Sequence, residues 1–185
     1  SRQSRGLGDV YKRQSHDRLK PDTAIIDAAH LINLPKEVFF STFLDALNQC
    51  FESFWNKNST EKSLKYSTRG IAHAMSIMKN LSRIDNKKLA LVSLYSGLSI
   101  SITKTGICHS ISYPLTSHYK IPHGIACMFS FIEVLSYNIK NDDGRFSKYF
   151  PDSNSLVKTF ENFFDRISFT NKINQLVSKD CLLYT

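Results

Sequence analysis

Residues 35–55, PKEVFFSTFLDALNQCFESFW, decide the fold class of this chain. Their apolar side chains recur at intervals of three and four residues, and this spacing places them on one broad face of an α-helix. That face carries Phe40, Phe43, Leu44, Leu47, Phe51, Phe54 and Trp55. We therefore expect a long amphipathic helix here, packed against other helices.

The sequence that follows predicts two more helices and then a break. Residues 58–60, Asn-Ser-Thr, form a cap for a helix that ends near Asn80, and residues 86–102 form the next helix. The side chains expected to point inward are Leu64, Ile71, Met75 and Met78 in the first, and Leu91, Leu94 and Leu98 in the second. Pro114 and Pro122 should bracket an irregular segment, because proline lacks an amide donor and restricts the residue before it.

Helical spacing resumes at His123 and continues through Ile125, Phe129, Ile132 and Leu135. Residues 141–144, NDDG, predict a turn, and a last helix should start at Ser153 or Ser155. At the other end, residues 22–27, DTAIID, are short and partly apolar, which predicts one strand. The fold class is therefore all-α, preceded by a single strand.

Both ends of the sequence resemble sequencing-adapter read-through. Back-translation of residues 9–14, DVYKRQ, gives GAT GTG TAT AAG AGA CAG, which reads as the transposase mosaic end of sequencing libraries. Residues 181–185, CLLYT, give TGT CTC TTA TAC ACA, the start of the same element on the opposite strand. We therefore expect residues 1–14 and 181–185 to be adapter-derived, and we take residues 15–180 as protein.

Charge and composition disfavour two classes of partner. The formal charge is +8, but residues 1–14 hold four basic residues and one acidic residue, which leaves +5 for the rest. No dense run of Lys and Arg with interleaved aromatics occurs, so we expect no nucleic-acid partner. The longest apolar stretch, residues 91–102, is shorter than the roughly 18–20 residues of a membrane span, so we expect no transmembrane helix.

Cysteine usage indicates the compartment. Once Cys181 is set aside, Cys50, Cys108 and Cys127 remain, with no CxxC among them. A sparse and unpatterned set of cysteines is typical of a reducing environment, so we expect a cytoplasmic protein.

Three side chains have the chemistry of metal ligands. Asp45 lies between the core-like residues Leu44 and Leu47, so its carboxylate must face a cleft or meet a partner, since an unpaired buried carboxylate is costly. His109 follows a break at Gly106, and His123 opens the next helix. Two imidazoles and one carboxylate are a ligand set typical of a divalent metal site. The alternative is an Asp on a solvated helix face with two incidental histidines.

Three segments resemble the iron-containing alcohol dehydrogenase family. Residues 106–138, GICHSISYPLTSHYKIPHGIACMFSFIEVLSYN, are similar to its G-x-x-H segment followed by P-H-G. Residues 45–55, DALNQCFESFW, resemble its first metal-binding helix, commonly D-A-x-x-H-x-x-E. Residues 20–35, KPDTAIIDAAHLINLP, resemble the stretch that leaves its nucleotide-binding domain. The resemblance implies that residues 15–34 end that domain and its linker, and that residues 35–180 form the C-terminal helical metal-binding domain.

Carried over to this sequence, the resemblance implies Asp45, His109 and His123 as metal ligands. Four residues after Asp45 the family usually has a histidine, whereas this chain has Gln49, a weaker donor that either coordinates poorly or not at all. Iron(II) and zinc both remain open. Tyr113 stands where many members have another histidine near the nicotinamide, so it is a candidate cofactor contact.

The resemblance implies an NAD(P)-linked alcohol dehydrogenase or aldehyde reductase whose metal polarises the oxygen of a small alcohol or aldehyde. The Gln variant is similar to a branch that reduces phosphonoacetaldehyde, in which Lys104 is a candidate for contact with an anionic substrate group. NAD(P)H is expected to bind mainly to an upstream domain, so the chain alone should be inactive. The apolar face near Phe160, Phe163 and Phe164 should then be exposed, because the family's last helices are expected to follow.

Two other functions compete with this interpretation. A non-haem iron enzyme also uses two histidines and one carboxylate, but it usually carries them on a β-barrel. A non-enzymatic helical interaction domain would have no tight metal site. The resemblance leaves open whether the full-length enzyme is a homo-oligomer.

Overall fold

The computed structural model describes residues 21–176, and these residues are helical apart from short connections. A short 3-10 helix, η2 (Ala28–Leu31), precedes the long α2 (Lys36–Trp55), α3 (Glu61–Lys79) and α4 (Asn86–Thr103). The remaining helices are α5 (Ile107–Tyr119), α6 (His123–Met128), α7 (Phe131–Lys140), α8 (Arg145–Tyr149), α9 (Ser153–Arg166) and α10 (Phe169–Leu176). The all-α prediction is confirmed.

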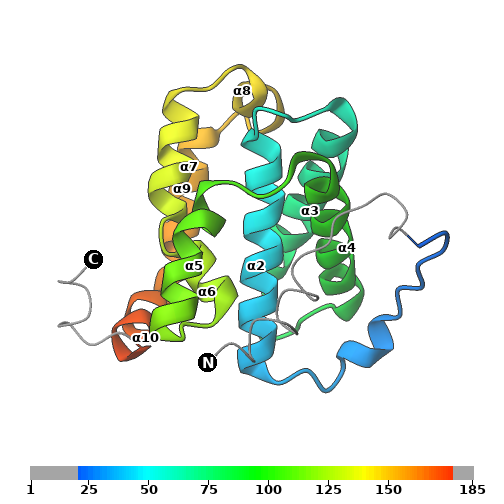
Figure 1. The fold of residues 1–185 in the computed structure, drawn as a ribbon, viewed down its shortest axis with the longest axis vertical. Helices are drawn as coiled ribbons and strands as arrows, with labels where there is room; N and C mark the ends of the chain where they lie inside the picture. Colours follow the sequence, from blue (N-terminus) through cyan, green and yellow to red (C-terminus); the bar gives the residue numbers. More distant parts are fainter. Residues whose placement is uncertain (1–20, 177–185) are drawn as a thin grey trace, which may run out of the picture.

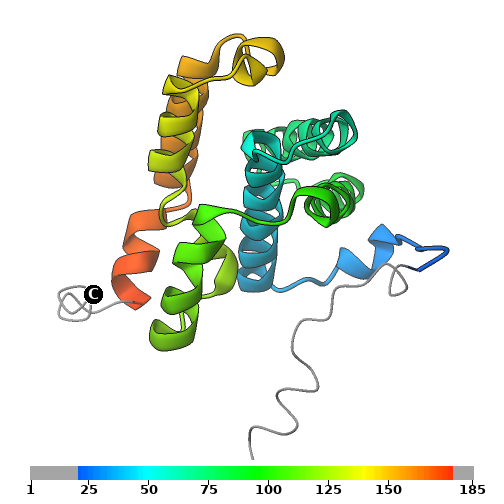
Figure 2. The ribbon, with the colours of Figure 1, turned by 45° about the horizontal axis from the view of Figure 1, so that its top comes forward.

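Helix α2 runs through the middle of the molecule, with α3 and α4 on one side and α5, α6, α7 and α9 on the other (Figures 1 and 2). From Phe43 to Phe54 it is largely buried, because its large apolar side chains face neighbours on both sides. Phe51, for example, packs edge-on against Phe131 of α7 and Phe160 of α9. Phe43 makes a similar contact with Phe163. The apolar face predicted for residues 35–55 is therefore the core of the domain.

Caps set the ends of the helices around α2. Thr60 and Ser63 form a reciprocal capping box at the start of α3, as the cap predicted at residues 58–60 requires. The carboxylate of Asp85 accepts hydrogen bonds from the first amides of α4. At the far end of α2, the guanidinium of Arg145 donates to the carbonyl oxygens of Phe54, Trp55 and Asn56. A cation here also suits the negative end of the helix dipole.

The prediction of which α4 side chains face inward was wrong. Leu98 is exposed and Leu91 and Leu94 are only half-buried, whereas Leu89 and Val92 are buried. Ser96, Ser99 and Thr103 complete the buried face. Small hydroxyl residues let α4 lie close to α2, and Thr103 Oγ1 bonds Ser53 Oγ across the contact at 3.0 Å. Their hydroxyls also bond carbonyls of the preceding turn of α4, so burial leaves them partnered.

The segment between the two prolines is helical, not irregular. Helix α5 continues through Pro114 to Tyr119. Proline removes only one hydrogen bond of the helix ladder, and Ser112 and Leu115 on either side are buried against the rest of the domain. Conversely, the single helix predicted from His123 to Leu135 is divided at Phe129 and Ser130 into α6 and α7. The two pieces pack on different partners, α6 on α2 and α7 on α9.

Two predictions at the ends of the domain were also wrong. Residues 22–27 form no strand, because an extended segment becomes one only when a neighbouring strand pairs with it, and none does within residues 21–176. Phe160 and Phe163 are buried rather than exposed, because α9 turns this face onto α2 and α7. The turn at residues 141–144 and the helix start at Ser153 are as predicted. The predicted adapter-derived ends, residues 1–14 and 181–185, lie outside the described residues.

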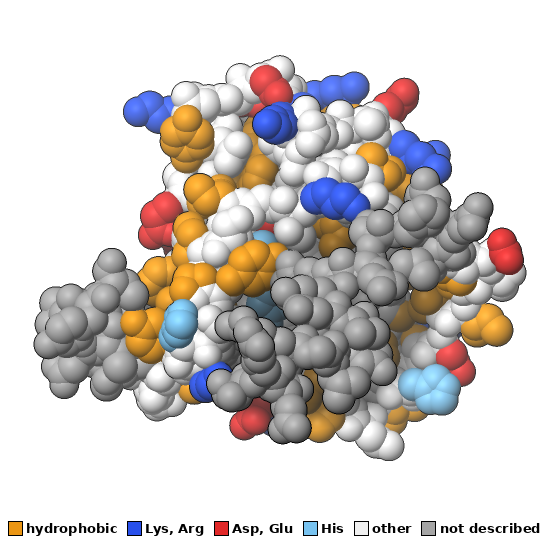
Figure 3. Space-filling model, viewed as in Figure 1, with side chains coloured by type: hydrophobic (Ala, Val, Ile, Leu, Met, Phe, Trp, Pro, Cys, Tyr) orange, Lys and Arg blue, Asp and Glu red, His pale blue; other side chains and the backbone are white. Residues whose placement is uncertain are grey.

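The surface is uneven in character. Figure 3 shows hydrophobic side chains gathered over α5 and α7, with most charged side chains towards the edges of this face. The exposed large apolar residues of these two helices are Ile107, Tyr113 and Tyr137. None of the helices within residues 21–176 combines the length and the apolar character needed to cross a membrane.

Candidate metal centre

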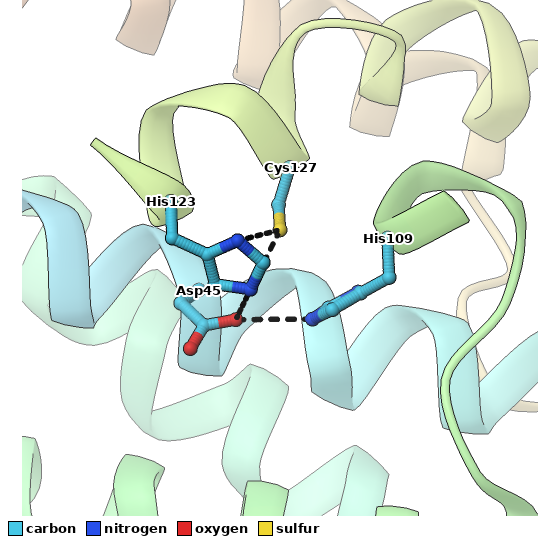
Figure 4. Close-up of side chains that lie close together, drawn as sticks. All are labelled: Asp45, His109, His123 and Cys127. Atoms are coloured by element: carbon cyan, nitrogen blue, oxygen red, sulfur yellow. Dashed lines mark hydrogen bonds and ion pairs between the residues drawn. The ribbon is translucent and has the colours of Figure 1, made fainter. Parts of the chain in front are cut away.

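Three helices bring the predicted ligands together. Asp45 comes from the middle of α2, His109 from the first turn of α5 and His123 from the first residue of α6. His109 Nε2 lies 3.1 Å and His123 Nε2 lies 3.9 Å from Asp45 Oδ1. Figure 4 shows both rings directed at this carboxylate oxygen. Two side chains that lie 64 and 78 residues after Asp45 in the sequence are therefore close to its carboxylate in space.

A buried carboxylate supports His109 from behind. Glu52, two turns after Asp45 on α2, is fully buried, and its Oε2 lies 2.7 Å from His109 Nδ1. Its oxygens also accept hydrogen bonds from the amides of Gly106 at 2.7 Å and Cys108 at 2.6 Å. The cost of burying this charge is offset by these donors at the positive end of α5. Nε2 faces the carboxylate of Asp45, which accepts a hydrogen bond from it. A cation that displaces this proton would bind the Nε2 lone pair, while Glu52 holds the Nδ1 proton.

Electrostatics at His109 favour a cation. Burial alone lowers the pKa of His109, but hydrogen bonds with Asp45, Cys127 and Glu52 act in the opposite direction and raise that pKa to about 12. The site thus stabilises positive charge at the imidazole. A metal ion bound through Nε2 takes the place of a proton at the same atom.

Gly124 explains how α6 reaches the site. A Cβ atom at this position would overlap the backbone carbonyl oxygen of Ser41 and crowd the amide of Asp45. Only glycine allows α6 to lie directly on the backbone of α2. The amide of Gly124 also donates a hydrogen bond to Ser41 Oγ at 3.2 Å. The glycine of the P-H-G motif therefore sets the distance between His123 and Asp45.

The structure places the other predicted residues around this cluster in different ways. Gln49 donates a hydrogen bond from Nε2 to Asp45 Oδ1 at 2.9 Å, so its amide group holds the carboxylate. The ring of Tyr113 lies parallel to that of His123, with the ring centroids 6.4 Å apart. Tyr113 is 37% exposed to solvent. The aromatic ring is therefore beside the site and accessible from outside.

Lys104 lies elsewhere. It lines a cavity of about 800 Å³ with Lys57, Glu52, Gly106 and other residues at the C-terminal end of α2. Glu52 is seven residues beyond Asp45, roughly 10 Å along the helix axis. The cavity thus adjoins the Glu52 side of His109 and not the cluster at Asp45.

Two residues of the site were not assigned a role from the sequence. Glu52 is the last residue of the family's D-A-x-x-H-x-x-E pattern, but that pattern does not indicate that it bonds His109. Cys127 lies one helical turn after His123, and its Sγ is 3.6 Å from His123 Nε2. The spacing of four residues on one helix was the available signal.

The fold and the cluster define a helical domain in which Asp45, His109, His123 and Cys127 could hold a metal ion. Residues 39–173 match the Fe-containing alcohol dehydrogenase family, C-terminal. The chain belongs to the iron-containing alcohol dehydrogenase family.

Individual relatives agree with this assignment. The chain is 32% identical over 126 residues to a phosphonoacetaldehyde reductase from Streptomyces viridochromogenes, a match that covers 65% of this chain and 32% of that protein. Among solved structures, the sulfoacetaldehyde reductase of Bifidobacterium kashiwanohense in complex with NAD+ superposes with a TM-score of 0.74 at 24% identity. The superposed region covers 82% of this chain and 43% of the sulfoacetaldehyde reductase. An iron-containing alcohol dehydrogenase from Thermococcus thioreducens superposes with a TM-score of 0.77 at 18% identity. That superposition covers 91% of this chain and 47% of the dehydrogenase. The chain therefore spans less than half the length of these relatives.

Proposed function

We propose that this chain is the metal-binding part of an NAD(P)-linked alcohol dehydrogenase or aldehyde reductase, with Asp45, His109 and His123 as protein ligands of one divalent cation. The observation that carries the proposal is the convergence of these three side chains, from three helices, with donor atoms all within 4.8 Å of one another. The family membership favours this function over a helical interaction domain and over a barrel-type non-haem iron enzyme.

The donor set fits the ion that the family name implies. One carboxylate oxygen and two imidazole nitrogens suit iron(II) and zinc alike. A cation held there supplies a Lewis acid that polarises the oxygen of an alcohol or aldehyde. Glu52 fixes the ring and tautomer of His109, and Gln49 fixes the carboxylate of Asp45. These two residues hold the donors in place without contacting the substrate.

Access to the cluster comes from the side of Asp45 and His123. Their side chains are 27% and 38% exposed, whereas that of His109 is 4% exposed. A small alcohol or aldehyde therefore approaches over α6 and the exposed ring of Tyr113, which we place beside the nicotinamide of the cofactor. Two of the relatives reduce, by name, aldehydes that carry a phosphonate or a sulfonate. We include such short anionic aldehydes in the proposed substrate class.

Metal stoichiometry tests the proposal. The chain should bind about one zinc or cobalt ion when it is equilibrated with the metal alone, and His109→Ala should abolish that binding because it removes a nitrogen donor and strands Glu52. His118→Ala is the matched control, since His118 lies on the same helix but is exposed. Equal metal content in all three proteins, or no tight site in the unaltered chain, would refute the proposal.

A further inference from the structure

Cys127 is placed within the cluster of predicted ligands. It is fully buried on α6, and its sulfur, with donor atoms of Asp45, His109 and His123, forms a group in which all atoms lie within 4.8 Å of one another. Figure 4 shows the thiol on the same side of α6 as the ring of His123. Cys50 and Cys108 are also buried but belong to no such group within the described residues.

The donor atoms are spaced near the separations of a coordination shell, and the whole group lies within 4.8 Å. Metal–ligand bonds of about 2.0 Å to nitrogen or oxygen and about 2.3 Å to sulfur, arranged tetrahedrally, separate neighbouring donors by roughly 3.3–3.6 Å. Cys127 Sγ lies 3.6 Å from His123 Nε2, and His109 Nε2 lies 3.1 Å from Asp45 Oδ1. The sulfur is therefore near enough to the other three donor atoms to serve as a fourth donor.

Gln49 leaves that fourth position to another residue. It occupies the helix position at which the family usually has a histidine, but its Nε2 atom points at Asp45 Oδ1 and donates a hydrogen bond to it. An amide turned this way presents hydrogens, which cannot bind a cation. Gln49 is thus a positioning residue for Asp45.

We propose that Cys127 is the fourth protein ligand of the metal site, bound as a thiolate, and that the site prefers a thiophilic ion such as zinc over iron(II). The inference rests on the proposed function. On binding, the sulfur donates an electron pair to the cation and its proton passes to water, with no change of oxidation state. Soft thiolate ligands favour zinc, whereas nitrogen and oxygen donors alone discriminate less between the two ions.

Four protein donors still leave room for a substrate oxygen. Catalytic zinc sites usually have three protein ligands, so a substrate oxygen beside four protein donors requires the five-coordinate geometry that such sites sometimes reach. The partial exposure of Asp45 and His123 leaves one side of the cluster open. Cys127 approaches from the buried side. Cys127 would therefore bind from the interior, and the exposed part of the cluster would remain accessible to a substrate.

Cobalt(II) titration of the full chain tests this inference, with Cys127→Ser as the variant. Cys50→Ser is the matched control, because it is the same change at an equally buried cysteine, on the opposite side of α2 against Gly70. The unaltered chain and Cys50→Ser should develop a near-ultraviolet thiolate-to-cobalt charge-transfer band as one ion binds. Cys127→Ser should keep its helical circular dichroism but lose this band, and its preference for zinc over iron(II) should fall by at least about tenfold.

Zinc-edge X-ray absorption of the unaltered chain gives a second measurement that needs no variant to fold. One sulfur at about 2.3 Å in the first coordination shell is the expected result. Metal bound with nitrogen and oxygen donors only, or a cobalt band that survives in Cys127→Ser, overturns the role of Cys127 and leaves the metal site intact. A chain that binds no metal overturns the proposed function, and this inference with it.

Discussion

Glu52 shows how much of the site depends on residues that do not touch the ion. Its carboxylate is the shared acceptor for His109 Nδ1 and for two amides at the start of α5. This arrangement ties the orientation of a ligand to the position of a helix. In metal sites, such partners fix the tautomer and increase the basicity of the ligating histidine.

We expect Glu52→Gln to weaken zinc binding by about 10- to 100-fold. The Glu52 carboxylate accepts from three donors, whereas a glutamine amide would direct its own hydrogens at one or more of them. His109 would then lose its fixed orientation. Competition with a chromogenic chelator measures the affinity. Glu61→Gln, at an exposed position in the first turn of α3, is the control and should bind zinc as before. Equal zinc affinities in the two variants would show that Glu52 does not support the metal site.

The residue types of the site were predictable to different degrees. Asp45, His109 and His123 could be identified because their chemistry and spacing form a pattern along the chain. Gln49 could be identified as a departure from that pattern, but whether its amide faces the ion or the carboxylate depends on side-chain rotamers. The contact between Glu52 and His109 joins residues 57 positions apart, and no local spacing encodes it.

At the scale of helices, the site depends on how closely α6 approaches α2. Gly124 permits backbone contact with Ser41, and small buried residues of α4 pack on the other side of α2, where Thr103 bonds Ser53. The periodicity of large apolar residues therefore predicted α2 well and misplaced the buried face of α4. Ser96 and Ser99 can be buried there because each hydroxyl donates a hydrogen bond to a carbonyl oxygen of the same helix, a property that apolar periodicity does not reveal.

Gly124→Ala should lower the free energy of unfolding by about 1–3 kcal/mol, because the added methyl group forces α6 away from the backbone of α2. Zinc affinity should fall with it, since α6 carries His123. Gly97→Ala is the matched control: its Cβ would meet no atom within 4 Å, so it should stabilise α4 by about 0.5–1 kcal/mol. Urea unfolding of both variants measures the difference. A Gly124 variant as stable as the original chain would contradict the close packing described here.

On the scale of the whole molecule, three helices that are separate in sequence are joined by one prospective ion. Binding to the folded state alone raises stability by about 2.7 kcal/mol when the free ion is at 100 times its dissociation constant. The apparent melting temperature of the chain should therefore rise with zinc concentration. His109→Ala should show no such rise, whereas His118→Ala should match the unaltered chain. A metal-independent melting temperature in the unaltered chain would argue against a site that links α2, α5 and α6.

The chain by itself should not oxidise NADH in the presence of an aldehyde, even when loaded with zinc. Within residues 21–176 there is no strand followed by a glycine-rich turn, the usual cradle for a dinucleotide pyrophosphate. Absorbance at the nicotinamide band, with acetaldehyde and phosphonoacetaldehyde as substrates, measures turnover. Sustained turnover that depends on the metal would show that residues of this chain suffice to bind the cofactor.

Anomalous diffraction at the zinc edge, from crystals of the chain grown with zinc, would locate the ion relative to the three predicted ligands. We predict one strong peak within bonding distance of Asp45, His109 and His123, about 2.0–2.2 Å from an oxygen or nitrogen of each. A peak at another position, or a fully occupied ion that contacts only one of the three side chains, would contradict the account.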